Sequence, residues 1–196
     1  MSEIDFYYDF RSPFAYFATQ RMSLLTDRGA RISWRPIYVD VLLNLQQGQT
    51  PWDEPADPFC PPKRTHFMAD ILRLIEFWKI PFQMPSPVKP SANQAMAIAA
   101  LSVQDGIEHA KFRDAVFRAI WQEQKDASDP SVLRACLEAG DLEPELMDRA
   151  TEKGVDLLTQ ETVSAFGRGV FGTPTFVCGE DLYFGADRME MIAARI

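Results

Sequence analysis

A proline begins a short apolar run near the end of this chain and limits the structure that the run can form. The segment Val170-Phe171-Gly172-Thr173-Pro174-Thr175 leads into Phe176-Val177-Cys178, and a short run of β-branched and aromatic residues predicts a strand. Because proline lacks the N–H group that a sheet uses, it is tolerated at the first residue of a strand. We therefore expect a strand over residues 174–178 that starts with Pro174, and a cis peptide bond before it.

A helix start follows the first strand of the chain. Residues 4–10, Ile-Asp-Phe-Tyr-Tyr-Asp-Phe, form an aromatic run that predicts a buried strand. Ser12 and Pro13 come next, and serine followed by proline is typical of the N-cap and first position of a helix. A hydroxyl there can donate a hydrogen bond to an anion, since the helix dipole favours negative charge at this end. A thiolate from a cosubstrate is a suitable anion.

Between these two ends the pattern is helical. A helix over about 13–28 and a strand over 32–37 complete a β-α-β unit. A loop over 44–62, rich in proline, is long enough to belong to a site. Apolar periodicity then predicts helices over about 67–78, 92–104, 112–121, 130–140, 144–153 and 155–167. A second short strand over 182–184 and a helix from 187 end the chain.

This order predicts an α/β, thioredoxin-like fold with a large all-α insertion. Residues 1–40 and 169–196 would form a split thioredoxin-like domain, and residues 41–168 an inserted helical domain. In such a fold the cis-proline loop faces the start of the first helix, where a thioredoxin carries Cys-x-x-Cys. This chain carries Ser12-Pro13-Phe14-Ala15 there and cannot run dithiol chemistry at that place. Its three cysteines form neither a Cys-x-x-Cys pair nor a metal spacing: Cys60, Cys136 and Cys178.

Three motifs resemble a known family. They are Asp5-Phe6-Tyr7-Tyr8-Asp9-Phe10-Arg11-Ser12-Pro13-Phe14, the Val170 to Thr175 loop, and Phe184-Gly185-Ala186-Asp187-Arg188-Met189. In this order and spacing the chain resembles the 2-hydroxychromene-2-carboxylate isomerases and the related kappa-class glutathione transferases, which have a DsbA-like thioredoxin fold. The resemblance spans nearly the whole chain and implies glutathione as the cofactor, an aromatic small-molecule substrate and a homodimer.

The resemblance also implies roles for individual residues. Ser12 would be the catalytic residue that contacts the glutathione sulfur, and the backbone of Thr173, before Pro174, would pair with the cysteinyl part. The γ-glutamyl group would lie at Phe184-Gly185-Ala186-Asp187, with the Asp187 carboxylate near its ammonium group. Some relatives carry serine or asparagine where this chain has Ala186, so one side-chain hydrogen bond is expected to be missing. Two further positions complete the implied glutathione site, Gln49 and Lys63, and two the implied substrate site, Lys63 and Asn93.

Several of these residues also have a purely structural explanation, and Thr173 and Pro174 could be only a strand entry. Ser12 and Asp187 could act only as helix N-caps, a role worth about 1 kcal/mol. Lys63 could be a solvated surface lysine, and Asn93 a capping residue. Four aromatic side chains could line a pocket but are more typical of a core: Tyr8, Phe14, Trp52 and Phe59.

Composition narrows the class of protein. The 196 residues are 46% hydrophobic, which suits one substantial core. A net charge of −8 argues against a nucleic-acid surface, since phosphate binding needs clustered lysine and arginine. No apolar stretch reaches the length of a membrane span, and the acidic N-terminus lacks the features of a signal peptide, so we expect a cytoplasmic protein.

The leading hypothesis is a glutathione-dependent isomerase that acts on aromatic catabolites. Reversible addition of a thiolate to a conjugated double bond would allow rotation and then release of the other isomer. Lys63 and Arg64 are the candidate partners of a substrate carboxylate. Two alternatives stay open: a kappa-like glutathione S-transferase with the same site, and a non-enzymatic thioredoxin-fold module that binds peptides and does not need Asp187.

Overall fold

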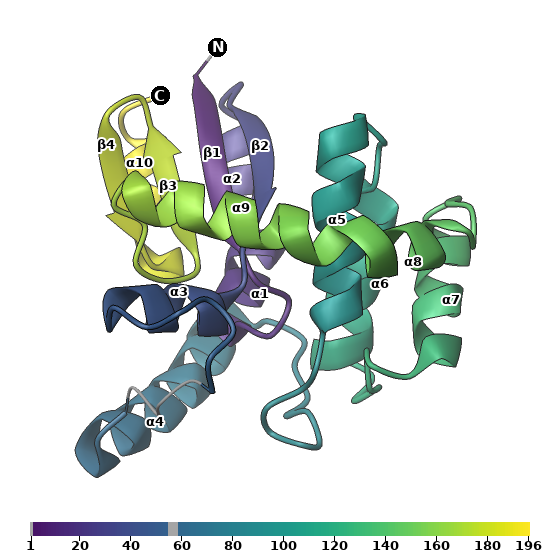
Figure 1. Ribbon diagram of the computed structural model, residues 1–196. Helices are drawn as coiled ribbons and strands as arrows, with labels where there is room; N and C mark the ends of the chain where they lie inside the picture. The colour runs from purple at the N-terminus through teal and green to yellow at the C-terminus, as the bar shows by residue number, and fades with distance from the viewer. Residues whose placement is uncertain (1, 55–58) are drawn as a thin grey trace.

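The computed structural model describes residues 2–54 and 59–196, so Pro55 and Pro58 of the predicted loop lie outside the described residues (Figure 1). Both ends of the chain meet in one four-stranded sheet, in the order β2-β1-β3-β4. The strands are β1 (Glu3–Tyr8), β2 (Arg31–Pro36), β3 (Thr175–Cys178) and β4 (Asp181–Phe184). β1 runs parallel to β2 and antiparallel to β3, and β4 pairs antiparallel with β3. The predicted α/β fold with helices between β2 and β3 is therefore confirmed.

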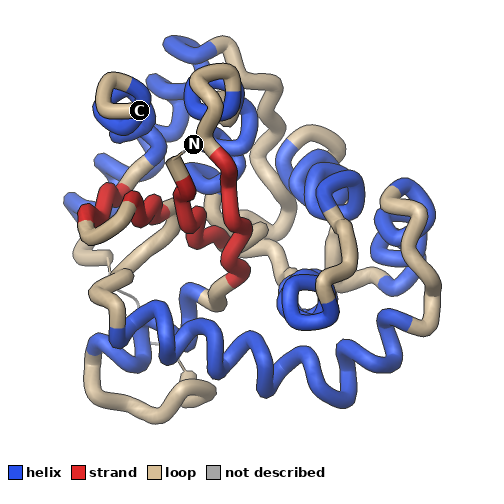
Figure 2. The backbone as a smooth tube through the Cα atoms, turned by 90° about the horizontal axis from the view of Figure 1, so that it is seen from above, coloured by secondary structure: helices blue, strands red, loops and turns tan. Residues whose placement is uncertain are grey.

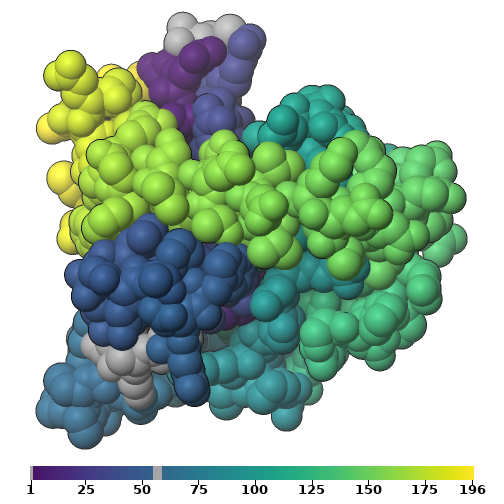
Figure 3. Space-filling view, in the orientation of Figure 1, coloured from purple at the N-terminus to yellow at the C-terminus, as the bar shows by residue number. Residues whose placement is uncertain are grey.

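Alternation along β1 sends its side chains into two cores. Ile4, Phe6 and Tyr8 are fully buried on one face, under α1 (Pro13–Gln20), α2 (Ser23–Thr26) and α10 (Met189–Ala193). Tyr7 faces the other side, with side chains of α3 (Val39–Gln46) and α9 (Val155–Gly167). α9 runs along this face of the sheet in Figure 2, and α9 and α3 together form its surface in Figure 3.

The remaining helices continue the first core beyond the sheet. They are α4 (Pro61–Trp78), α5 (Asn93–Asp105), α6 (Ala110–Trp121), α7 (Pro130–Ala139) and α8 (Leu146–Arg149). The indole N–H of Trp121 donates to the carbonyl of Phe10 at 2.7 Å and connects α6 to the segment between β1 and α1. Among the described helices, none combines the length and apolar character needed to cross a bilayer. The division at residues 40/41 and 168/169 stays a prediction.

Two boundaries near the N-terminus differ from those expected. The helix predicted over 13–28 ends at Gln20, because the N–H groups of Arg21 and Met22 bond to carbonyls three residues back, at 3.1 and 3.3 Å. The predicted loop over 44–62 begins inside a helix, since α3 extends from Val39 to Gln46. This helix is too short for periodicity to mark it, and its stability comes from burying Val41 and Leu42.

Gly154 lies inside one continuous helix, although the sequence predicted two helices that meet there. α8, a π-helical turn (Ala150–Gly154) and α9 follow one another without a break. A Cβ atom at residue 154 would lie 2.6 Å from the carbonyl oxygen of Ala97 and 2.8 Å from its Cβ atom. Glycine is therefore required at this point by the close approach of α5, and it does not end the helix.

Candidate functional site

The start of α1 and the cis-proline loop are in direct contact. Ser12 is the N-cap of α1, and its Oγ accepts a hydrogen bond from the N–H of Ala15 at 3.2 Å. The same hydroxyl donates to the carbonyl oxygen of Thr173 at 3.2 Å. The peptide bond between Thr173 and Pro174 is cis, as predicted. These contacts join two motifs from opposite ends of the chain.

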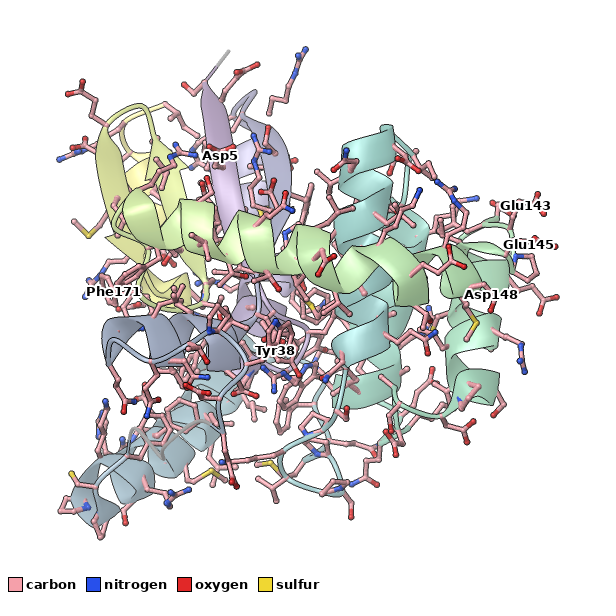
Figure 4. All side chains as sticks on the ribbon, in the orientation of Figure 1. Asp5, Tyr38, Glu143, Glu145, Asp148 and Phe171 are labelled. Atoms are coloured by element: carbon pink, nitrogen blue, oxygen red, sulfur yellow. The ribbon has the colours of Figure 1, made fainter. Side chains whose placement is uncertain are left out.

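The cis-proline loop is also bonded to the end of β4. The carbonyl of Pro174 accepts from the N–H of Gly185 at 2.9 Å. A Cβ atom at residue 172 would lie 2.6 Å from the ring of Phe184, so a larger residue there would displace this ring. That ring packs against Phe171 at 4.7 Å between centroids, and both rings are about half exposed. Figure 4 places Phe171 at the edge of the molecule, next to α3.

The structure corrects two expectations about the segment after β4. Asp187 is not the N-cap of the last helix: Arg188 has that position before α10, and Asp187 lies within a short 3-10 turn (Ala186–Arg188) that Gly185 precedes with φ of +107°. Its exposed carboxylate is 3.5 Å from the guanidinium of Arg188. Ala186 is buried in the core, only 1% exposed, so its side chain points away from the surface. A serine or asparagine here would enter the core and not a ligand site.

A buried ion pair that the sequence did not single out adjoins Ser12. The carboxylate of Asp9, 0% exposed, accepts from the Arg11 guanidinium at 2.9 and 3.2 Å and from the N–H groups of Arg11 and Val39 at 2.8 and 3.0 Å. Arg11 also pairs with Asp40 at 2.7 Å. Burial lowers the pKa of Arg11, but the charges of Asp9 and Asp40 raise it by more. The pKa is therefore higher than that of a free arginine, and the guanidinium stays charged. β1 ends at Tyr8, not at residue 10, because Asp9 turns to bind the start of α3.

Tyr38 connects this ion pair to Asn93 and to the loop after α3. The Arg11 guanidinium lies 4.0 Å from the centre of the Tyr38 ring, and the Trp52 ring lies 5.4 Å from it. The Tyr38 hydroxyl donates to Oδ1 of Asn93. Trp52 in turn donates from its indole N–H to Thr159 of α9 at 2.9 Å. Asn93 is the first residue of α5, and its side chain makes no capping bond.

Aromatic rings connect α1 to Lys63. Phe14 of α1 packs against Phe67 of α4 at 5.1 Å, and Phe67 packs against Phe59 at 4.8 Å. The ammonium of Lys63 lies 5.0 Å above the Phe59 ring. Lys63 is exposed, and its ammonium group lies beside the aromatic rings that connect α4 to α1. Of the candidate aromatic residues, Tyr8 is entirely core, whereas Phe14, Phe59 and Trp52 are partly or well exposed.

Gln49 stays apart from these contacts. It is exposed on the turn after α3, and its N–H donates to the carbonyl of Asn44 at 2.9 Å. The buried amide of Asn44 holds the following loop by donating to the carbonyls of Pro51 and Asp53, at 3.0 and 2.7 Å. In the part of the chain that the structure describes, no hydrogen bond joins the Gln49 side chain to the Ser12 region.

Two surface cavities lie away from Ser12. One, of about 330 Å³, lies between β2 and the C-terminal end of α5, and His109 lines it. The other, of about 690 Å³, lies at the opposite end of the sheet from the cis-proline loop, among Asp5, Arg168 and Arg195. None of the predicted site residues lines either cavity. We take the half-buried Ser12 region as the candidate site, because a hydroxyl, a helix start and a strand end converge there.

A sequence model of the DSBA-like thioredoxin domain matches residues 3–196. The chain belongs to the DSBA-like thioredoxin domain family. Within this family it is similar to the 2-hydroxychromene-2-carboxylate isomerase of Sphingobium xenophagum, at 29% identity over 192 residues that cover 96% of this chain and 95% of the relative. It is also 25% identical to the protein named glutathione S-transferase kappa 1 of Caenorhabditis elegans, over 98% of this chain and 90% of that one.

The solved structure of a 2-hydroxychromene-2-carboxylate isomerase has the same DSBA-like fold. It superposes with a TM-score of 0.76 at 23% identity, covering 98% of this chain and 93% of the other. The agreement extends over the helical segment as well as the sheet, which confirms the predicted thioredoxin-like fold with its helices in place.

Proposed function

We propose that this protein is a glutathione-dependent isomerase of the 2-hydroxychromene-2-carboxylate type. One observation carries the proposal: the Ser12 hydroxyl lies at the start of α1 and against the carbonyl that precedes cis-Pro174. The isomerase relatives support this reaction, and the relative named glutathione S-transferase kappa 1 supports the use of glutathione.

The residues around Ser12 suit the thiol of glutathione. The N–H of Ala15 donates to Ser12 Oγ and occupies one of its lone pairs. The hydroxyl proton is therefore directed away from that N–H, and the carbonyl of Thr173 accepts the hydrogen bond that it makes. The same proton can turn to a bound sulfur, and the helix start favours the sulfur in its anionic form. When bound, glutathione supplies a nucleophilic thiolate that adds reversibly to a conjugated carbon. Ser12 then holds the sulfur in place and exchanges its hydrogen bond between sulfur and Thr173.

Charged and polar residues around Ser12 are the proposed partners of the remaining groups of glutathione and of the substrate. The exposed Asp187 carboxylate is the partner proposed for the ammonium of glutathione, with Gly185 and Phe184 beside it. The backbone of Thr173 is the partner proposed for the cysteinyl part. Lys63 offers the positive charge for a carboxylate of the aromatic substrate, and Asn93 a polar contact. We also propose a homodimer and a role for Gln49 at the glutathione site.

Calorimetric titration with glutathione tests the cofactor site. We expect binding by the wild-type chain and its loss in Asp187→Ala. Glu180→Ala, an exposed acid in the turn between β3 and β4, is the matched control and should bind as the wild type does. If the wild-type chain binds no glutathione, the proposal is wrong, and a peptide-binding module becomes the better interpretation.

Product analysis separates the isomerase from a kappa-like transferase, which the Caenorhabditis elegans relative favours as the second candidate. An isomerase interconverts 2-hydroxychromene-2-carboxylate and its open-chain isomer at constant glutathione concentration. A transferase consumes glutathione in step with substrate and leaves a stable thioether. The two outcomes are distinguished by measuring free thiol during turnover.

A further inference from the structure

A chain of contacts runs from the buried carboxylate of Asp9 to the exposed amide of Asn93. It begins with the four hydrogen bonds that Asp9 accepts, two from the Arg11 guanidinium and two from backbone N–H groups. With Asp40 on the other side, the guanidinium is held from two directions. Arg11 directly precedes Ser12, so the chain of contacts starts beside the proposed catalytic hydroxyl.

The second contact in this chain is the Tyr38 ring. It lies 4.0 Å from the Arg11 guanidinium and is only 4% exposed, and the Trp52 ring packs 5.4 Å away. A cation over an aromatic face is attracted to it, more strongly when both are shielded from water. The ring therefore has a fixed position, and Figure 4 shows Tyr38 near the middle of the molecule, beside α3 and below α9.

The third contact fixes the orientation of the Asn93 amide. Burial raises the pKa of Tyr38, so the phenol stays protonated, and its hydroxyl donates a hydrogen bond to Oδ1 of Asn93. An amide has one oxygen acceptor and two N–H donors. With its oxygen held by Tyr38, the Nδ2 group is directed away from that ring. Asn93 is exposed, and no acceptor for Nδ2 lies among residues 2–54 and 59–196.

Charge decides which kind of ligand atom suits these donors. Two carboxylates and one guanidinium, of Asp9, Asp40 and Arg11, leave a net negative charge behind Tyr38. A second anion is disfavoured next to them, whereas a neutral carbonyl oxygen accepts amide N–H groups without that repulsion. The substrate carboxylate is better placed toward Lys63, beyond the Phe14 and Phe59 rings.

We propose that Tyr38 is a positioning residue, which holds the Asn93 amide so that its Nδ2 hydrogens bind a carbonyl oxygen of the aromatic substrate. Arg11, itself fixed by Asp9, keeps the Tyr38 ring in place. This inference rests on the proposed function and extends it, because it explains how the organic substrate is oriented relative to Ser12.

A double-mutant cycle on binding tests this role. The probe is chromone-2-carboxylate, a stable ring carbonyl compound, titrated by calorimetry into the full chain. Loss of one hydrogen bond is worth about 0.5–1.5 kcal/mol, so Tyr38→Phe and Asn93→Ala should each raise Kd about 2- to 13-fold. Because the hydroxyl acts through the amide, the double variant should bind no more weakly than Asn93→Ala alone.

Two controls separate positioning from a general structural effect. Tyr16→Phe also removes a tyrosine hydroxyl, one that donates to the carbonyl of Pro81 at 2.5 Å, and should leave Kd unchanged. Chroman-2-carboxylate lacks the ring carbonyl, so its Kd should not respond to Tyr38→Phe. Additive effects in the cycle, an equal response with chroman-2-carboxylate, or no binding of the chromone by the wild type would each overturn the inference.

A separate glutathione titration distinguishes this inference from the proposed function. Glutathione binding by Tyr38→Phe should equal that of the wild type. If the wild-type chain binds no glutathione but the chromone cycle gives the expected coupling, the isomerase proposal fails and the positioning role of Tyr38 stands.

Discussion

The hydroxyl of Ser12 donates to the carbonyl oxygen of Thr173 across 161 positions of sequence. This single hydrogen bond joins the start of α1 to the loop that carries cis-Pro174, and each partner comes from a different end of the chain. In this bond the Ser12 hydroxyl proton points toward Thr173. A ligand sulfur at the helix start would have to replace Thr173 as the acceptor.

Ser12→Ala should therefore lower turnover far more than it weakens glutathione binding. Removing one preorganised donor to a developing or stabilised anion typically costs about 10²- to 10³-fold in rate. The variant also loses an N-cap, so Asp129→Ala is the matched control: Asp129 caps α7 through the N–H of Ser131 at 2.7 Å, far from the site in sequence. Both variants should lose about 1 kcal/mol of stability, but only Ser12→Ala should lose activity. Equal losses in kcat and in glutathione affinity would contradict this role.

Asp9→Asn should destabilise the fold by about 3 kcal/mol, since it leaves the buried side of the Arg11 guanidinium without a charged partner. The Asp9 side chain is fully buried, whereas that of Asp40, on the other side of Arg11, is 36% exposed. Asp40→Asn should therefore cost no more than about 1 kcal/mol. Urea denaturation of both variants measures the difference, and equal losses would show that burial does not govern this pair.

The free energy of unfolding should fall as the pH drops below about 6.5, which is the unperturbed pKa of histidine. His109 should account for part of this loss. Burial lowers the pKa of His109, and the charge of nearby Arg113 lowers it too. The hydrogen bond to the Ile107 carbonyl and the negative charge of Glu108 raise it, but the pKa remains lower than that of a free histidine. The folded state thus keeps this ring neutral while the unfolded state takes up a proton, so lower pH favours unfolding.

Thermal unfolding at pH 7.5 and 5.5 checks this dependence. His109→Asn, whose amide can still donate to Ile107, should show a smaller drop in Tm than the wild type. His66→Gln, on the exposed side of α4, should keep the full drop. The idea fails if the two variants respond alike.

Gly154→Ala should destabilise the protein by about 1–3 kcal/mol, because the added methyl group overlaps the Ala97 backbone of α5. Gly167, at the end of α9, is the natural comparison, since a Cβ atom there would have nothing within 4 Å. Gly167→Ala should leave stability unchanged or raise it by up to about 1 kcal/mol, since alanine favours a helix. Equal effects at both positions would mean that close packing does not select glycine at 154.

Local features of the sequence identified most elements of the fold. Ser12 before Pro13 and Asp129 before Pro130 predicted two helix starts, because a side-chain cap and a fixed φ act within a few residues. Aromatic and β-branched runs located the strands, and Pro174 marked the cis bond, although β3 starts one residue later than predicted, at Thr175. The motifs around Ser12, Thr173 and Asp187 likewise indicated the family and a candidate site from the sequence alone.

Tertiary contacts decided the rest. Whether Gly154 ends a helix depends on how closely α5 approaches, and whether Ala186 faces a ligand depends on the core beneath it. The contacts that lead from the Asp9–Arg11 pair through Tyr38 to Asn93 are also tertiary. The last of them joins Tyr38 to Asn93, which are 55 positions apart. No local pattern encodes such contacts, because the free energy of a buried charge or an oriented amide depends on partners that only the folded chain brings together.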